Sequence, residues 1–284
     1  MPGFAGLGIG LRETSGWITT ETAWRVYVHR KHARRSLARS ECVPERLFDI
    51  PTDVIEATAT RCASSLEPPI EGAAIANDRG VPGSLGCIAW LRASEQPVLL
   101  STYHVLFGKR CQRGDAVWSV APDKTLRPIG RVLTGKAGIV VGIDLPTFVD
   151  AAICSVVDAT AAETLAGAQA GAAEHCHAGD FVSKRGAATG RTHGVVIDIA
   201  YPDVWYWEYR SQNAPRQILI RSTSPDRPFS RAGDSGAVVR NERGQLLGLL
   251  WGTTARGEGV ASPTGAVARA LAIRFANTPT TAVS

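Results

Sequence analysis

The sequence predicts an all-β core built as barrels or sandwiches, and two observations carry that prediction. From residue 84 onward, short apolar runs alternate with turn residues, which gives about a dozen strand candidates in two sets. The 284 residues also include 29 glycines and 16 prolines, which is typical of a chain with many turns. Closely spaced short strands favour barrels or sandwiches over an alternation of strands and helices.

The composition excludes several classes of protein. Hydrophobic residues make up 44% and charged residues 20%, as in a soluble globular protein. The net charge of +5 is mild, and no basic patch interleaved with aromatics indicates a nucleic-acid partner. No run approaches the roughly 18 apolar residues of a membrane helix, and the first residues lack the pattern of a signal peptide. We therefore expect a cytoplasmic protein without a membrane partner, whose six cysteines are free thiols.

Residues 1–57 are expected to form a small α/β unit. Stretches rich in β-formers indicate strands at residues 6–12, 23–29 and 52–57. The basic run at 30–40 is compatible with a helix, and its charges are most simply a solvated helix face. Residues 58–83 carry Ser, Pro, Gly and Asn with little periodicity, so we expect a connector there.

Two sets of strands divide the rest of the chain. The first set occupies residues 84–158, and the second, which an Ala-rich helix or loop introduces, lies within 159–275. The stretch at 264–275 has the pattern of a closing amphipathic helix. Its candidate core positions are Val267, Leu271 and Ile273. Residues 276–284 form a tail.

The segment Gly233-Asp234-Ser235-Gly236 is the first candidate for chemistry. It is also compatible with a plain surface turn, since Gly, Asp and Ser are common turn residues. A serine hydroxyl is a poor nucleophile at neutral pH, and it needs a base to take its proton and usually an acid to orient that base. The catalytic interpretation therefore depends on a histidine and a carboxylate elsewhere in the chain.

His104 and Asp150 are the candidates for that pair. His104 ends an apolar stretch, VLLSTYHVLFG, where a barrel strand delivers a side chain to the rim, whereas the other five histidines lie in polar or loop-like surroundings. Asp150 enters the apolar stretch FVDAAICSV, so we expect its carboxylate to be buried and to need a donor. Asp144 is the competing acid, but a turn role is sufficient for it in the loop-like GIDLP.

The chain order His104, Asp150, Ser235 is that of the chymotrypsin-like serine peptidases, and the surrounding segments are similar to the motifs of that family. GDSGAVV resembles the nucleophile motif, STYHVLFG the histidine motif and VDAAICSV the aspartate motif. Further similar segments lie at 183–196, 246–252 and 259–271. The match covers about residues 84–275, and the N-terminal unit resembles the leader region of some intracellular trypsin-like peptidases of bacteria and plants.

The resemblance implies two six-stranded antiparallel β-barrels of chymotrypsin type with a C-terminal helix, the first carrying His and Asp and the second carrying Ser. Ser235 is then the nucleophile, His104 its base and Asp150 the acid that orients the base. The backbone N–H groups of Gly233 and Ser235 form the implied oxyanion hole. Pairing with the substrate backbone falls to Leu250, Trp251 and Gly252.

The residues before the nucleophile bear on substrate preference. In the trypsin-like arrangement an acid six residues before the nucleophile selects Lys or Arg, but Phe229 stands there, with Ser230 beside it. We therefore expect an apolar or small residue before the scissile bond. Val105 replaces the cysteine that often follows the histidine in secreted members, and the start lacks an IVGG-like segment. The partner of Asp234 stays open between an arginine and a backbone donor.

The favoured function is an intracellular serine endopeptidase that acts on a protein or peptide and uses no cofactor and no metal. One alternative is a non-catalytic peptide-binding module on the same scaffold. Another is a hydrolase of small esters, although GDSG is not its usual G-x-S-x-G elbow. Because an unregulated protease harms its cell, we expect that its activity is gated. The N-terminal unit could supply this gate by binding a regulatory partner or by forming a homo-oligomer.

Two other motifs have simpler explanations than function. HCH at 175–177 places three potential metal ligands in adjacent positions, from which they do not easily converge on one ion. VWYWEYR at 204–210 indicates either a peptide-binding ledge or an aromatic strand packed on the core, and core packing is favoured.

Overall fold

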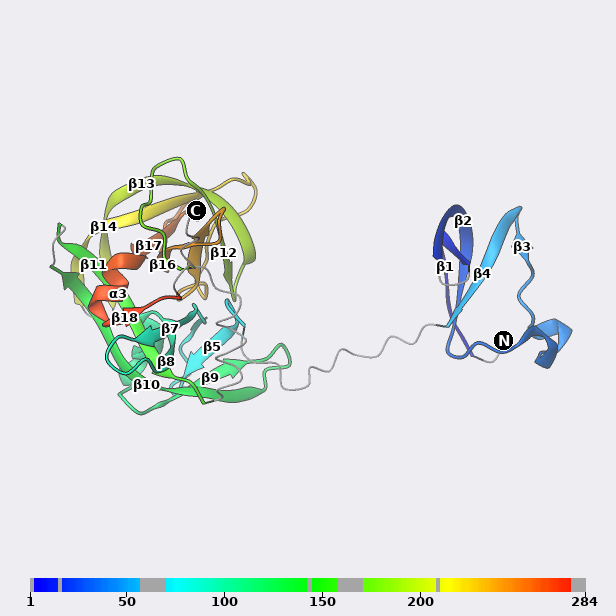
Figure 1. Cartoon of the computed structure of the whole chain (residues 1–284), viewed down its shortest axis with the longest axis horizontal. Coiled ribbons are helices and arrows are strands. Elements are labelled where there is room, and N and C mark those ends of the chain that lie inside the picture. The colour runs from blue at the N-terminus through cyan, green and yellow to red at the C-terminus, as the bar shows by residue number, and fades with distance from the viewer. Residues whose placement is uncertain are drawn as a thin grey trace, which may run out of the picture. The chain divides into compact units, whose positions relative to one another are not determined.

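The computed structural model describes residues 3–14, 17–56, 70–141, 145–157, 171–207 and 210–276. The chain divides into two compact units, Met1–Ser65 and Leu66–Ser284. Figure 1 shows the sheets of each unit. Most of the Ala-rich stretch that we expected to introduce the second set of strands lies outside the described residues.

The N-terminal unit is a four-stranded sheet with the order β1-β2-β4-β3. Its strands are β1 (Phe4–Thr14), β2 (Trp17–Val28), β3 (Arg46–Leu47) and β4 (Ile50–Glu56). The three strands expected from the sequence correspond to β1, β2 and β4. β1 and β2 form an antiparallel hairpin, whereas β2 and β4 are parallel, so the chain has to cross over between them.

The crossover segment does not form the helix that we expected over residues 30–40. It contains two 3-10 turns, η1 (Arg34–Ser36) and η2 (Arg39–Glu41), and neither buries a residue. An α-helix here would stack like charges four residues apart, as in Arg35 on Arg39, with little apolar surface to bury in return. The prediction of a solvated basic segment therefore holds, but the prediction of a helix was wrong.

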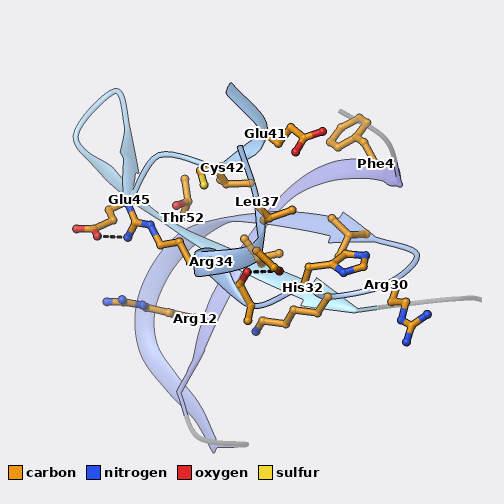
Figure 2. Close-up of a pocket in the computed structure, with 16 residues that line it drawn as sticks. Phe4, Arg12, Arg30, His32, Arg34, Leu37, Glu41, Cys42, Glu45 and Thr52 are labelled. Atoms are coloured by element: carbon orange, nitrogen blue, oxygen red, sulfur yellow. Dashed lines mark hydrogen bonds and ion pairs between the residues drawn. The ribbon is translucent and has the colours of Figure 1, made fainter. Parts of the chain in front are cut away.

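A cavity of about 800 Å³ lies in the N-terminal unit, between the crossover segment and the sheet (Figure 2). Val28 and Val54 on the strands and Leu37 on the crossover segment contribute apolar lining. Several cationic side chains line it as well, and one of them, Arg34, is paired with Glu45 at 2.6 Å. The N-terminal unit thus has a hollow surface of its own, which includes none of the residues predicted for catalysis.

The larger unit begins with an antiparallel sheet of eight strands, which Figure 1 shows curled, in the order β18-β7-β8-β11-β10-β9-β5-β6. Its strands are β5 (Ala74–Asn77), β6 (Pro82–Ser84), β7 (Ile88–Leu91), β8 (Pro97–Ser101), β9 (Ala116–Val120), β10 (Leu126–Val140), β11 (Thr147–Ser155) and β18 (Ile273–Arg274). The two strands beyond the expected six are the short β6 and β18 at the ends of the order. β5 and most of β6 lie where we expected a connector. They were not predicted as strands because strands this short give no readable alternation.

The second sheet is a closed antiparallel barrel of six strands, in the order β12-β13-β14-β17-β16-β15. Its strands are β12 (Phe181–Gly186), β13 (Gly190–Trp207), β14 (Arg210–Ser222), β15 (Val238–Asn241), β16 (Leu246–Thr253) and β17 (Gly259–Pro263). β13 and β14 form a long hairpin, and β14 also contacts β11 of the first sheet. The fold class predicted from the sequence, a β core of two barrels with a closing helix, is confirmed.

The closing helix is shorter than predicted. It is α3 (Thr264–Ala270), and the chain then turns at Ala272, whose φ of 52° is left-handed, so that Ile273 begins β18 and pairs with β7. Val267, Leu271 and Ile273 are all buried, as we expected. In the part of the chain that the structure describes, no helix has the length and apolar character that a membrane span requires.

An apolar cluster joins the two barrels. Phe148 of β11 packs against Trp205 of β13 and Trp251 of β16, with ring centroids 5.7 Å apart in both pairs. The other buried members of this cluster are Ala214, Leu219 and Val260. Phe148 lies two residues before Asp150 on β11, so the cluster is next to the predicted acid.

Candidate active site

His104 lies on the short helix α1 (Tyr103–Leu106), just after β8 ends. Its Nδ1 is 2.6 Å from Asp150 Oδ2, and its backbone N–H donates to Asp150 Oδ1 at 3.2 Å. Both oxygens of one carboxylate therefore hold the histidine. Because an ionised carboxylate only accepts hydrogen bonds, Nδ1 carries the proton, and Nε2 is left as the base.

The pKa of His104 is raised above its ordinary value. Burial alone would lower this pKa, but the negative charge of Asp150 and the hydrogen bond to it outweigh burial. The His104 side chain is still 25% exposed, whereas that of Asp150 is fully buried. The imidazole is thus open to a substrate and stabilised when it takes up a proton.

Asp150 is surrounded by hydrogen-bonding groups from the second barrel. Trp205 Nε1 donates to Asp150 Oδ2 at 2.6 Å. The backbone N–H of Asp150 donates to Ser262 Oγ at 3.3 Å, and Ser262 Oγ in turn donates to Gln217 Oε1 at 3.2 Å. The Asp150 carboxylate is therefore buried, as predicted, and it has the hydrogen-bond donors that a buried charge needs. Asp144, the competing acid, lies outside the described residues.

The place of Trp205 in this site was not predicted from the sequence. The aromatic run was expected to pack on the core, and Trp205 is indeed buried, with 4% of its surface exposed. A buried indole N–H also needs an acceptor, and that requirement was the only available signal. The strand pairing that directs this side chain to Asp150 was not readable.

Ser235 lies half-buried in the turn before β15, and its hydroxyl donates to the carbonyl of Trp251 at 3.2 Å. The following Gly236 has a φ of +99°, and a Cβ there would collide with Ser84 O and Ser101 Oγ. A hydrogen bond from the Ser84 N–H to the Ser235 carbonyl, at 2.7 Å, ties the turn to β6 of the first barrel. These contacts explain why a glycine follows the serine.

The first barrel also brings Ser235 close to the histidine helix. A Cβ on Gly83 would lie within 3.0 Å of both the Ser235 carbonyl and the side chain of Val105, the residue after His104. Among the described residues, no hydrogen bond joins Ser235 Oγ to His104. The Ser235 hydroxyl donates to Trp251 O instead, and catalytic hydrogen bonds often tighten only when substrate binds.

The predicted oxyanion hole depends on the turn before Ser235. Gly233 has a φ of +99°, which favours glycine. Its carbonyl accepts from Ser84 Oγ at 2.9 Å, and the Asp234 N–H donates to Arg231 O at 3.0 Å. Within the part of the chain that the structure describes, the N–H groups of Gly233 and Ser235 have no partner. They are free to donate to a substrate oxygen.

The partner of Asp234 is Lys184 rather than an arginine. Both side chains are fully buried, and Nζ lies 3.0 Å from Asp234 Oδ2. The backbone N–H groups of Arg231, Ala188 and Thr189 each donate to the same carboxylate at 3.0 Å, and Thr189 Oγ1 donates at 2.8 Å. The backbone donors that we considered are therefore present as well, in addition to a cation that we did not expect.

The two pKa values of this pair move in the same direction. Burial would raise the pKa of Asp234, but the Arg231 N–H, the Lys184 charge and the Thr189 hydrogen bonds outweigh it and lower the pKa. Burial lowers the pKa of Lys184, and the charge of Asp234 offsets that effect only in part. We regard the pair as ionised at neutral pH, because the carboxylate has five donors and the ammonium has a carboxylate.

The residues predicted to meet the substrate differ in their accessibility. Phe229 is fully buried in the core of the second barrel, with Lys184 Nζ 5.9 Å from its ring centroid. Ser230 is also buried, and its hydroxyl faces Gly252 O at 3.5 Å. The side chain of Leu250 belongs to the same core. Of these residues, Gly252 is partly exposed, and it lies opposite Val260 of β17.

The predicted strand residue Trp251 contacts both the nucleophile and the barrel interface. Its carbonyl accepts from Ser235 Oγ, and its Nε1 donates to Gln217 Oε1 at 2.6 Å. Gln217 is fully buried and donates through Nε2 to Phe148 O at 3.0 Å. This network fixes the strand that was predicted to pair with substrate.

A second cavity, of about 680 Å³, adjoins the nucleophile turn. One wall includes Arg231 and Ala232, which precede Gly233, and another includes Thr253 and Thr254, which follow Gly252. Its other lining residues are Arg221, Ser222, Ser224, Pro225, Asp226, Arg227, Pro228, Ala255, Arg256, Gly257 and Glu258. Arg221 is paired with Glu258 at 2.8 Å, so the remaining three arginines outnumber the one remaining carboxylate, Asp226, and leave this rim positively charged.

The histidines of the HCH motif do not assemble a metal site in the structure. The rings of His175 and His177 are 6.1 Å apart, and each side chain is largely exposed. Among the described residues, no group of three or more His, Cys, Asp or Glu side chains is placed to hold a metal ion.

Comparison with known proteins gives matches at the level of structure alone. No family model and no curated protein matches the sequence. A glutamic acid-specific serine protease aligns with 73% of this chain and 100% of its own, at 15% identity and a TM-score of 0.51. Thermobifida fusca protease A aligns with 74% of this chain and 99% of its own (13% identity, TM-score 0.48), and Nocardiopsis protease with 73% and 98% (18% identity, TM-score 0.46). The fold of this chain is chymotrypsin-like, as the resemblance of its motifs implied.

Proposed function

We propose that the chain is a serine endopeptidase that cleaves peptide bonds through an acyl-enzyme on Ser235. The observation that carries the proposal is the His104–Asp150 pair, which is held through both carboxylate oxygens beside the turn of Ser235. A peptide-binding module without catalysis has no need of a buried carboxylate aimed at an accessible imidazole.

In the proposed mechanism the Ser235 hydroxyl leaves the Trp251 carbonyl and turns to His104 Nε2. His104 takes its proton while the oxygen attacks the peptide carbonyl, and later gives that proton to the leaving amine. Asp150 stabilises the imidazolium that forms between these steps. The raised pKa of His104 is consistent with this role, because the pair favours the protonated form.

The oxyanion of the tetrahedral intermediate is assigned to the N–H groups of Gly233 and Ser235. The buried Asp234–Lys184 pair supports that assignment. Asp234 accepts from the Arg231 N–H within the turn and from the Thr189 N–H of the neighbouring β12–β13 turn, which holds the nucleophile turn in place. Removing one oxyanion donor commonly costs about 3 kcal/mol of transition-state stabilisation.

For the substrate, we propose an apolar or small residue before the scissile bond and discrimination against Lys and Arg. Phe229 points into the core, so it provides neither a carboxylate nor an exposed ring. The cavity beside the nucleophile turn is lined by Arg227, Arg231 and Arg256, whose charges repel a basic side chain. A peptide library cleaved mainly after Arg or Lys would contradict this part of the proposal.

We further propose that the protease works in the cytoplasm and that the N-terminal unit restrains it by binding a regulatory partner. Leu7, Ile9 and Leu11 support this proposal, because β1 is an edge strand that leaves them 46% to 62% exposed. Ile9→Lys in the chain that carries the N-terminal unit is expected to raise peptidase activity in cells. Unchanged activity would count against a gate on this face, and a change in the mass of the purified protein would favour a homo-oligomer.

The central experiment is labelling with a fluorophosphonate probe, followed by a comparison of peptide and ester turnover. The wild-type chain is expected to be labelled on Ser235 and to hydrolyse peptides, and Ser235→Ala is expected to lose both while keeping its fold. Labelling without peptide turnover would indicate an esterase. Absence of labelling in a folded wild-type chain would favour the non-catalytic alternative. N-terminal proteomics of cells with wild type and Ser235→Ala would then identify the protein substrate.

A further inference from the structure

We propose that Trp205 is a positioning residue of the catalytic pair, whose indole N–H fixes the Asp150 carboxylate in the orientation that holds His104. The inference rests on the proposed function. It concerns a residue of the second barrel that acts across the interface on a carboxylate of the first.

The carboxylate has a specific arrangement of donors. Asp150 Oδ2 receives both His104 Nδ1 and Trp205 Nε1, each at 2.6 Å, while Oδ1 receives the backbone N–H of His104 at 3.2 Å. Rotation of the carboxylate about its Cβ–Cγ bond therefore breaks hydrogen bonds on both sides at once. Without the indole, Oδ2 keeps only the imidazole, and the carboxylate gains freedom to turn away from it.

A tryptophan is chemically suited to this position. The Asp150 side chain is fully buried, so its charge needs donors. An indole N–H donates but never takes up a proton, so it stabilises the carboxylate without neutralising it. A lysine in the same position would compensate the charge of Asp150, and His104 would lose much of the attraction that favours its protonated form.

The packing holds the indole in place. Trp205 lies near the end of β13, in register with Gln212 of β14, and is 4% exposed. Its ring packs on Phe148 with centroids 5.7 Å apart and an angle of 44° between the planes. Since Phe148 and Asp150 are on the same strand, the ring contact and the hydrogen bond together set the distance from the hairpin to the carboxylate.

The decisive variant is Trp205→Phe, which keeps an aromatic ring and removes the N–H. Loss of a hydrogen bond to a charged group is expected to lower kcat by about tenfold or more. The acid limb of the pH profile of kcat/KM is expected to move up by on the order of half a pH unit. Without the indole hydrogen bond, the negative charge of Asp150 acts more strongly on His104 and raises its pKa. A merely structural role would lower thermal stability without moving this limb.

Trp118→Phe is the matched control. Trp118 Nε1 also donates to an aspartate, Asp78 Oδ1 at 3.1 Å, but on the exposed surface of the first barrel. The elements packed against the catalytic pair carry other titratable or charged side chains, and both variants keep them. These are Tyr103 on α1, Arg127, Arg131 and Lys136 on β10, Cys154 on β11, Arg191, His193, Asp198, Tyr201 and Asp203 on β13, Arg216 and Arg221 on β14, and Arg269 on α3. A shift confined to Trp205→Phe therefore reports the indole. Equal kcat and equal pH limbs in the two variants would overturn the proposal.

A second measurement uses the wild-type chain and does not depend on the folding of a variant. In a sample with ¹⁵N-labelled tryptophan, one indole N–H resonance is expected to titrate with the same pKa as His104. If every indole resonance stays constant through the His104 titration, the proposal is wrong. Because this titration needs no turnover, it remains informative if the fluorophosphonate probe fails to label Ser235 and the proposed function falls.

Discussion

Asp150 and Asp234 are both fully buried, and the two differ in the nature of their partners. Asp234 has a permanent cation, Lys184, with four further donors, so its charge is compensated whether or not a substrate is bound. Asp150 has neutral N–H donors from Trp205 and the backbone, and its third partner, His104, becomes a cation only when it takes a proton.

In the proposed mechanism, this difference gives the two carboxylates different tasks. A carboxylate with a fixed cation holds a shape, here the turn that presents the Gly233 and Ser235 N–H groups. A carboxylate whose charge is left uncompensated attracts a proton to its histidine, which is what a general base requires. The identity of the residue and its burial are the same, and the partner decides the function.

The largest expected effect comes from replacing the uncompensated carboxylate. Asp150→Asn is expected to lower kcat by about 10⁴-fold, because an amide cannot accept at both of its ends. In one orientation of the amide, its NH₂ group faces the N–H donors of the Trp205 and His104 side chains. In the other orientation, it faces the backbone N–H of His104. Steady-state kinetics with a peptide substrate measures the loss. Ser235→Ala and His104→Ala are expected to lose as much, with strongly non-additive combinations.

Asp144→Asn is the control for the choice of acid. It is expected to keep nearly full turnover, since a turn role is sufficient for that residue. If Asp144→Asn abolished activity while Asp150→Asn kept it, then Asp150 would be a structural carboxylate like Asp234, and the comparison would collapse.

The next effect is on stability, at the compensated carboxylate. Lys184→Met keeps the length of the side chain and removes its charge, which leaves Asp234 buried without a cation. Breaking a buried pair in this way costs about 3–5 kcal/mol, and a loss of that size lowers the melting temperature by roughly 10 °C. Thermal unfolding followed by circular dichroism measures it, with Lys136→Met, on the exposed surface of β10, as the matched control.

Asp234→Asn in the Lys184→Met background sharpens the test. Removing the second charge is expected to recover part of the stability, since no unpaired charge then remains buried. A Lys184→Met variant that melts with the wild type would mean that the N–H and O–H donors suffice for Asp234. The two carboxylates would then differ less than their partners indicate.

The pH dependence is a smaller effect and has opposite signs for activity and stability. Because the pKa of His104 is raised above 6.5, the acid limb of kcat/KM is expected to lie above that value, with activity falling about tenfold per pH unit below it. The stabilisation from the protonated His104–Asp150 pair is complete below 6.5 and is lost as pH rises through the higher folded pKa. Activity should therefore rise in the same pH window where this contribution to stability declines. A limb at or below 6.5 would contradict the pairing.

The candidate catalytic residues could be named from the sequence, and the residues that support them in the structure could not. Ser235 and His104 are recognisable because a reactive residue type stands in a short segment with unusual neighbours. Lys184 was missed because a lysine in a strand is expected to face solvent, and only the pairing of β12 with β15 turns it inward beside Val182. Trp205 was missed for a related reason, since the register of a long hairpin with several irregularities does not follow from composition.

The strands of the two-barrel core were predictable where they are long, and those at the ends of the first sheet were not, because a short strand carries no readable pattern. Long alternation of apolar runs and turns identifies strands such as β10 and β16, which bury one face or both. β6 and β18 have only three and two residues, and they pair because longer neighbours are already in place. The basic crossover in the N-terminal unit has no strong pattern, so tertiary context decided against a helix.

The smallest expected effect concerns a third kind of buried ionisable group, the thiols. The cysteines of the described residues are free, and burial raises the pKa of Cys154 to about 12 and that of Cys176 to about 11. Unlike in Asp234, burial dominates in these two thiols and raises their pKa values, so they stay protonated and unreactive at neutral pH. We expect turnover and melting temperature to be unchanged, within about 1 °C, when reductant is added. A loss of several degrees would reveal a structural disulfide and would point first to Cys62, which lies outside the described residues. In that case a disulfide bond, and not only the Lys184–Asp234 ion pair, would contribute to the melting temperature that the Lys184→Met experiment measures.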